Sequence, residues 1–156
     1  GGGVSSRLFQ QVREQQGLCY SIYSYGAGHA ETGVFCIYTA LNKETEAKAL
    51  ATIRLVIDEF LAKGPTDEEL ERAREQSKAN VIMGLESTQS RMSHAGRSLL
   101  FSGEILTPEQ IIDAYDCVTR EDVVALAQEI FAWERASLSA VGQVRTAEEY
   151  RQLVLG

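Results

Sequence analysis

The sequence predicts an α+β domain, in which a mostly antiparallel sheet has helices packed on one face. Two adjacent segments are typical of strands, a third such segment follows much later, and the segments around them carry helical patterns with capping signals. Adjacent strands can pair as a hairpin, and the late strand then has to return to the same sheet. A length of 156 residues fits one globular domain that folds without a disulfide or a metal ion.

The N-terminal third is expected to form a helix and two strands. The helix covers residues 5–16, and Gly17 supplies a left-handed residue at its end. An aromatic and β-branched strand follows at residues 18–25, and the glycines of residues 26–28 are expected to break it. Residues 33–41 form the second strand, which is apolar on both alternations and is therefore expected to be covered on both faces or central in its sheet.

Helices are expected to dominate the rest of the chain. Asn42 is expected to cap a helix over residues 43–63. A long helical stretch then runs to about residue 100, with a kink or break expected at Gly84 and residues 87–90. Residues 136–142 are typical of the late strand. The buried stripe of the helix over 43–63 is predicted to consist of Leu50, Ile53, Ile57, Phe60 and Leu61. Capping boxes begin at Thr66, Thr107, Thr119 and Thr146.

The net charge and the cysteines argue against several classes of binding partner and of structural site. The net charge of −7 argues against a nucleic acid or an anionic membrane, because both attract clustered Lys and Arg. No apolar run approaches the roughly 18 residues that a membrane span requires. The cysteines, Cys19, Cys36 and Cys117, are widely spaced and odd in number, which favours small buried side chains over a disulfide framework or a zinc site.

The residues alone indicate no self-contained catalyst. His29 and His94 are far apart, no H-x-x-E-H or H-E-x-x-H motif is present, and we predict no metal site in the chain. No serine or cysteine has an obvious histidine–acid partner. Gly1-Gly2-Gly3 before a helix could bind an anion, but a flexible turn is the favoured interpretation because the lysine of a phosphate-binding loop is absent.

Arg13 and Tyr20 are the most informative pair of polar residues. A tight helix-to-strand turn at Gly17 can bring the guanidinium and the phenol to one rim. There both groups could donate hydrogen bonds to a carbonyl that gains negative charge. Taken alone, the residues favour a structural alternative, in which Arg13 satisfies carbonyls at the end of the helix and Tyr20 is an aromatic residue of the sheet.

The segment GGVSSRLFQQVREQQGLCYSIYSY at residues 2–25 resembles the C-terminal domain of the pitrilysin-type zinc peptidases, which include the mitochondrial processing peptidases and their bacterial relatives. Residues 66–73, 85–92 and 118–123 resemble the same domain, in the same order. The resemblance implies a metal-free domain that closes the substrate chamber. It also implies that Arg13 and Tyr20 bind the substrate backbone, while an H-x-x-E-H motif and a distal Glu hold zinc in the N-terminal domain.

The resemblance predicts that residues 1–156 are a single non-catalytic C-terminal domain, incomplete at its N-terminal side, from a two-domain zinc metalloendopeptidase. The piece alone would be inactive and would hold no cofactor. Expected partners are a peptide substrate and an N-terminal catalytic domain of the same chain or of a second subunit, in a homo- or heterodimer. A cytoplasmic location is expected, with a periplasmic one as the alternative.

Two other functions remain open at this point. The domain could come from a catalytically inactive paralogue that serves as a structural or peptide-binding partner. It could also be a self-standing module that binds an anion at its glycine turn. An intact H-x-x-E-H motif upstream or in an adjacent gene would distinguish an active peptidase from the inactive paralogue.

Overall fold

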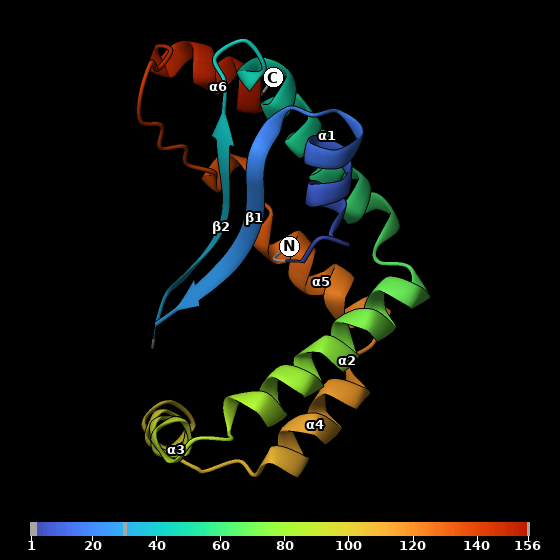
Figure 1. The fold of residues 1–156 in the computed structure, drawn as a ribbon, viewed down its shortest axis with the longest axis vertical. Coiled ribbons are helices and arrows are strands. Elements are labelled where there is room, and N and C mark those ends of the chain that lie inside the picture. Colours follow the sequence, from blue (N-terminus) through green and yellow to red (C-terminus); the bar gives the residue numbers. More distant parts are fainter. Residues whose placement is uncertain (1–2, 30, 156) are drawn as a thin grey trace. The chain divides into compact units, whose positions relative to one another are not determined.

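A computed structural model describes residues 3–29 and 31–155 (Figure 1). The chain divides into two compact units, the first formed by residues 1–63 and 126–156 and the second by residues 64–125. An antiparallel strand pair and a series of helices confirm the predicted α+β class.

The first unit is built around a hairpin. Strands β1 (Cys19–Gly28) and β2 (Gly33–Leu41) pair antiparallel, and Figure 1 shows them side by side along their length. The helical elements of this unit are η1 (Phe9–Gln15), α1 (Glu46–Lys63), the end of α5 (Arg120–Ile130), η2 (Trp133–Arg135) and α6 (Ala147–Leu155).

The core of the first unit joins η1, β1 and α1. The opposite face of the hairpin carries Tyr23, Tyr25 and Tyr38, whose exposed fractions are 42%, 49% and 49%. The helices therefore cover one face of the hairpin, as predicted. The buried cluster on that face consists of Leu8, Val12, Leu18, Ile22, Ala49, Ile53, Val56 and Ile57.

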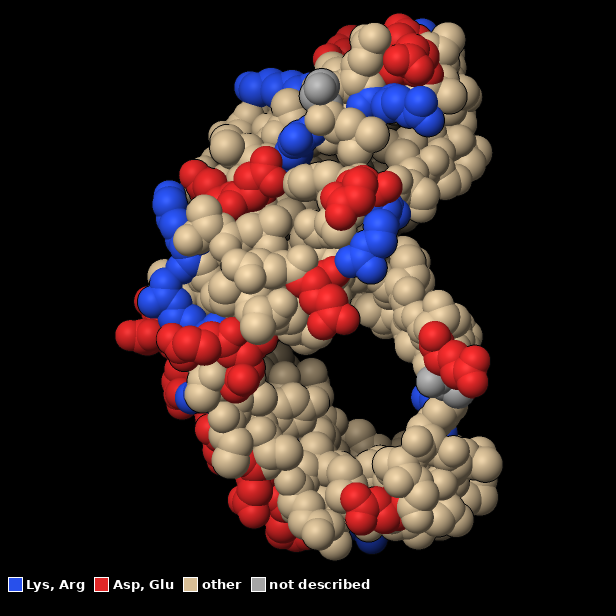
Figure 2. Space-filling view, turned by 180° about the vertical axis from the view of Figure 1, so that it is seen from behind, with Lys and Arg blue, Asp and Glu red and all other residues tan. Residues whose placement is uncertain are grey.

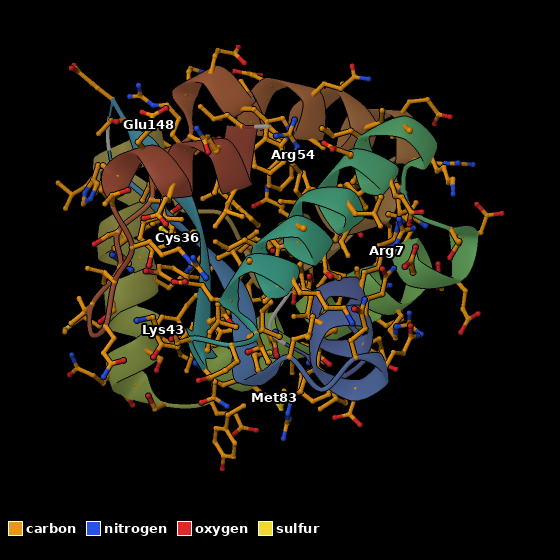
Figure 3. The ribbon with its side chains drawn as sticks, turned by 90° about the horizontal axis from the view of Figure 1, so that it is seen from above. Arg7, Cys36, Lys43, Arg54, Met83 and Glu148 are labelled. Atoms are coloured by element: carbon orange, nitrogen blue, oxygen red, sulfur yellow. The ribbon has the colours of Figure 1, made fainter. Side chains whose placement is uncertain are left out.

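Polar contacts attach α6 to α1. The carboxylate of Glu46 accepts a hydrogen bond from Arg145 Nε at 2.7 Å and another from the Tyr150 hydroxyl. Arg54 extends from α1 (Figure 3) and donates to the carbonyl of Val154 near the end of α6 at 2.6 Å. Glu46 is largely shielded from solvent, so loss of its partner Arg145 would leave a poorly solvated charge at the contact between α1 and α6.

The second unit consists of α2 (Asp67–Gly84), α3 (Thr88–Ser102), α4 (Pro108–Cys117) and the first part of α5. Lys78 of α2 lies 2.5 Å from a Glu75 oxygen and 2.8 Å from an Asp116 oxygen of α4. Both contacts raise the pKa of the Lys78 ammonium group, and the hydrogen bond with Asp116 has the larger effect. Arg74 also donates to the Val118 carbonyl, so ionic and polar contacts hold α2 against α4.

The predicted capping boxes are confirmed, and so is the break in the long helical stretch, which lies at residues 85–87 between α2 and α3. Each capping threonine accepts a backbone N–H three residues later, and the residue at that third position accepts the threonine N–H. The break separates α2 from α3 where the Ser87 side chain accepts the Ser90 N–H at 3.1 Å. The paired residues are Thr66 with Glu69, Thr107 with Gln110, Thr119 with Asp122, and Thr146 with Glu149.

The capping box at Thr119 should make the folding stability of the protein decrease at low pH. Hydrogen bonds from the hydroxyl and the backbone N–H of Thr119 lower the pKa of Asp122 below its usual 3.8. A carboxyl group whose pKa is lower in the folded than in the unfolded state stabilises the fold at any pH above its unfolded-state pKa. This stabilisation is lost as the pH falls through its folded-state pKa. We expect the urea midpoint of Asp122→Asn to fall less steeply than that of the wild type between roughly pH 5 and pH 2. Asp113→Asn, an exposed carboxylate of α4 outside any box, is the control, and equal slopes for Asp122→Asn and wild type would contradict the prediction.

Three predictions about the strands need correction. Residues 26–28 do not break the first strand, because β1 continues to Gly28 and pairs there with Gly33. The second strand is neither covered on both faces nor central in its sheet, since β1 is its one partner strand among the described residues and Val34 is 54% exposed. Residues 136–142 form no strand, because no described residue pairs with their backbone as a second strand, and Val141 is fully exposed.

The predicted start and buried stripe of α1 also differ from the structure. Asn42 does not cap the helix, which begins at Glu46 after a turn in which the Asn42 carbonyl accepts the Thr45 N–H. The Thr45 hydroxyl is tied to the Leu18 carbonyl at 2.8 Å, which fixes the helix start against the hairpin. Ile53 and Ile57 are buried as predicted, whereas Leu50, Phe60 and Leu61 are only half-buried, because the face that meets the core is centred on Ala49, Thr52 and Val56.

Candidate functional site

Arg13 and Tyr20 lie together at one rim of the first unit. The guanidinium carbon of Arg13 is 5.8 Å from the centroid of the Tyr20 ring. Gly17, with a φ of 61°, turns the chain from η1 into β1 between them. The Leu18 N–H donates to the Val12 carbonyl at 3.0 Å across this turn. The tight turn expected from the sequence therefore forms and brings the two side chains to the same rim.

Arg13 lies on a π-helix, not on the α-helix that the sequence predicts. η1 runs from Phe9 to Gln15, and the hydrogen bonds of a π-helix join residues five apart instead of four. Such helices are rare in proteins overall, but many of those known lie at functional sites. Val12 is fully buried beneath it and anchors the helix to the core. The carbonyl of Arg13 accepts the Gly17 N–H at 3.0 Å.

Tyr20 is the extra residue of a β-bulge. Cys19 pairs with Leu41 and Ser21 pairs with Ala40, so no residue of β2 stands opposite Tyr20. Strand alternation would place Tyr20 on the same face as Ile22, which is 4% exposed, yet Tyr20 is 85% exposed. The bulge thus aims the phenol out of the core, as bulges next to active sites do.

The hydrogen-bonding groups of this pair are not used within the described part of the chain. Among residues 3–29 and 31–155, none accepts a hydrogen bond from the Arg13 guanidinium or pairs with the Tyr20 hydroxyl. The nearest carboxylate to Arg13 is that of Glu14, at 4.0 Å from Nε. The pair can therefore present N–H and O–H donors together to a ligand carbonyl.

The other candidates lie apart from this pair. His29 is exposed, and Nε2 of the half-buried His94 lies 3.2 Å from the Leu106 carbonyl. No group of three His, Cys, Asp or Glu side chains in the described residues is arranged to hold a metal ion. Gly1 and Gly2 of the proposed anion-binding turn lie outside the described residues.

The open face of the hairpin is a feature that the sequence analysis missed. The rings of Tyr23 and Tyr38 stack with centroids 5.0 Å apart, and Tyr25 follows at 6.1 Å from Tyr23. A hydrogen bond with Cys36 (labelled in Figure 3) raises the pKa of the Tyr25 hydroxyl. The alternation of Tyr23 and Tyr25 in the strand pattern was the signal that could have identified this aromatic face.

Charged side chains are mixed over the visible surface. Most of the face that Figure 2 displays is tan, and at several places on it Asp or Glu side chains lie next to Lys or Arg, with more acidic than basic side chains in view. None of the helices formed by the described residues is both long and apolar enough to cross a membrane.

Comparison with known proteins identifies similar sequences. Residues 1–77 match the family described as "Peptidase M16 inactive domain". A protein of Streptomyces coelicolor named an uncharacterized zinc protease is 37% identical over 151 residues, which cover 97% of this chain and 33% of that protein. The uncharacterized zinc protease YmxG of Bacillus subtilis is 38% identical over 136 residues, covering 87% and 33%. The chain thus spans about a third of the length of these curated relatives.

Solved structures have the same fold. A peptidase M16 inactive domain from Pseudomonas fluorescens superposes with a TM-score of 0.75 at 26% identity, over 85% of this chain and 31% of that one. The periplasmic protease PqqL of Escherichia coli superposes with a TM-score of 0.67 at 19% identity, over 80% of this chain and 14% of that one. The second likeness concerns the fold alone.

Proposed function

Because this chain belongs to the peptidase M16 family as its C-terminal, inactive domain, we propose that it is the substrate-binding, chamber-closing half of a zinc endopeptidase. In this role Arg13 and Tyr20 bind the backbone carbonyl of the peptide to be cleaved. The family membership confirms the resemblance recognised in residues 2–25. The roles of Arg13 and Tyr20 in binding the peptide carbonyl are part of the proposal.

The observation that carries the proposal is the pairing of two hydrogen-bond donors at one rim of the first unit. The Arg13 guanidinium carbon is 5.8 Å from the centroid of the Tyr20 ring, and the Glu14 carboxylate beside Arg13 is as far as 4.0 Å from Nε. When water attacks a peptide bond, negative charge develops on the carbonyl oxygen. Preorganised donors aimed at that oxygen stabilise the transition state more than the substrate.

The residues of this chain do not fit a zinc site, because the described part lacks a suitable set of three ligands. The proposed contribution of the chain is therefore confined to binding and orienting the peptide and to donating hydrogen bonds to its carbonyl. The zinc ligands and the general base would lie in an N-terminal catalytic domain of the same protein or of a partner subunit.

The assembly and its location belong to the same proposal. The proposed role needs a catalytic domain opposite this one to enclose a peptide, and we propose that the two meet in a homo- or heterodimer. The location proposed is cytoplasmic. Gel filtration of the complete protein, alone and with a candidate catalytic subunit, tests the assembly directly.

Metal removal distinguishes this function from that of an inactive paralogue. We expect the complete enzyme to hydrolyse fluorescein-labelled casein, to lose this activity on treatment with a zinc chelator, and to regain it when zinc is restored. An inactive paralogue would bind the labelled casein without cleaving it, with or without zinc. That result would replace the peptidase proposal by the structural or peptide-binding alternative.

A further inference from the structure

We propose that Phe9 is a positioning residue for Arg13, which holds the guanidinium by its face and leaves its N–H groups available to the peptide carbonyl. The inference rests on the proposed role of Arg13. It assigns a function to a side chain for which the spacing of Leu8, Phe9 and Val12 predicts only a place on one apolar face of the first helix.

The guanidinium lies closer to Phe9 than to Tyr20. Its central carbon is 4.6 Å from the centroid of the Phe9 ring, compared with 5.8 Å for the Tyr20 ring. Both distances fall within the roughly 6 Å over which a cation is attracted to an aromatic face. Arg13 is thus held by two rings from different elements, one on η1 and one on β1.

An aromatic partner suits a donor that must remain available. A carboxylate would accept the N–H groups and compete with a substrate carbonyl, and the Glu14 carboxylate is only at the 4.0 Å limit of an ion pair. A ring contacts the π face of the guanidinium and uses none of its in-plane N–H groups. A free arginine side chain loses rotamer freedom when it is immobilised, so a prior contact with Phe9 lowers the cost of orienting it in the transition state.

Phe9 is itself fixed by the start of η1. Its N–H donates to Ser6 Oγ at 3.3 Å, and its neighbour Leu8 is buried in the core. Phe9 is half-buried and precedes Arg13 by four residues on the same helix. The ring therefore has a defined place from which to restrict the longer and more flexible arginine.

The test uses the complete enzyme and a quenched-fluorescent casein peptide that the wild type cleaves. We expect Phe9→Leu to lower kcat/KM by about 5- to 10-fold, mainly through kcat, because a contact of this kind contributes on the order of a tenfold effect when partly desolvated. Phe9→Tyr, which keeps the ring face, should restore most of the loss.

Phe60→Leu is the matched control. Arg7 (labelled in Figure 3) lies over the Phe60 ring at 5.2 Å, so this variant removes a similar contact in the same unit but away from Arg13. Its kcat/KM should stay within about twofold of the wild type, because the contact that it removes belongs to Arg7 and not to the pair of Arg13 and Tyr20.

A double-mutant cycle separates this inference from the proposed function. In an Arg13→Ala background, Phe9→Leu should cause no further loss of kcat/KM. If Arg13→Ala lowers turnover but Phe9→Leu does not, or if Phe9→Leu costs as much without Arg13, the positioning role is overturned and the role of Arg13 stands. If Arg13→Ala has no effect, both fall. For a complete protein that cleaves no peptide, the dissociation constant for the labelled peptide replaces kcat/KM, with the same criteria.

Discussion

Replacing Arg13 by alanine, or Tyr20 by phenylalanine, should lower the kcat/KM of the complete enzyme for peptide hydrolysis by about 100-fold, with the zinc content unchanged. The loss of one well-placed donor to a developing oxyanion typically costs this much or more. Most of the loss should appear in kcat, because the donors strengthen their bonds only as charge develops on the oxygen. The measurement is steady-state hydrolysis of a quenched-fluorescent peptide, with zinc determined by atomic absorption.

Two further variants make this result specific. Tyr23→Phe removes a hydroxyl from the open face of β1, three positions from Tyr20, and should leave turnover near that of the wild type. Arg13→Lys keeps the charge but loses the planar fork of donors, and should recover only part of the activity. Near wild-type turnover in both Arg13→Ala and Tyr20→Phe would remove the proposed role of the pair.

The closeness of Arg13 and Tyr20 was predictable because it depends on a few consecutive residues. Gly17 supplies the left-handed turn between helix and strand, and its φ of 61° is the conformation expected of it. The capping boxes were predictable for the same reason, since each is a bond pattern within four residues. Local chemistry of this kind leaves a direct signature in the sequence.

The backbone irregularities that aim the two side chains were not predictable. A π-helix and a β-bulge each accommodate an additional residue within a regular element, and the apolar spacing around Phe9 or Ile22 does not reveal it. The spacing of Leu8, Phe9 and Val12 predicts only that Phe9 lies on one apolar face of the first helix. Its contact with Arg13 depends on where the wider helix places it.

The pairing of strands that are distant in the sequence was the second feature that the sequence did not predict correctly. Residues 136–142 have the composition of a strand, but a strand exists only where another backbone accepts and donates its hydrogen bonds. No described residue pairs with this segment as a strand. The composition of a segment therefore indicates an extended chain, whereas the pairing depends on residues elsewhere in the protein.

Gly64→Ala should destabilise the second unit strongly. Gly64 has a φ of 68°, and a Cβ atom there would come within 2.7 Å of Val124 Cγ2 and 3.2 Å of Arg120 Nε. The left-handed conformation costs about 1–2 kcal/mol for a residue with a side chain. Crowding in a well-packed region adds about 1–3 kcal/mol, so the total loss should be about 2–5 kcal/mol.

Gly103→Ala separates the two contributions to this loss. Gly103 is also left-handed, with a φ of 78°, but a Cβ atom there would meet nothing within 4 Å. Its loss should be limited to the conformational cost of about 1–2 kcal/mol. Urea unfolding of the complete protein measures both variants. A smaller loss for Gly64→Ala than for Gly103→Ala would mean that Val124 and Arg120 yield to the added methyl group, and the packing at the start of the second unit would then be looser than its geometry indicates.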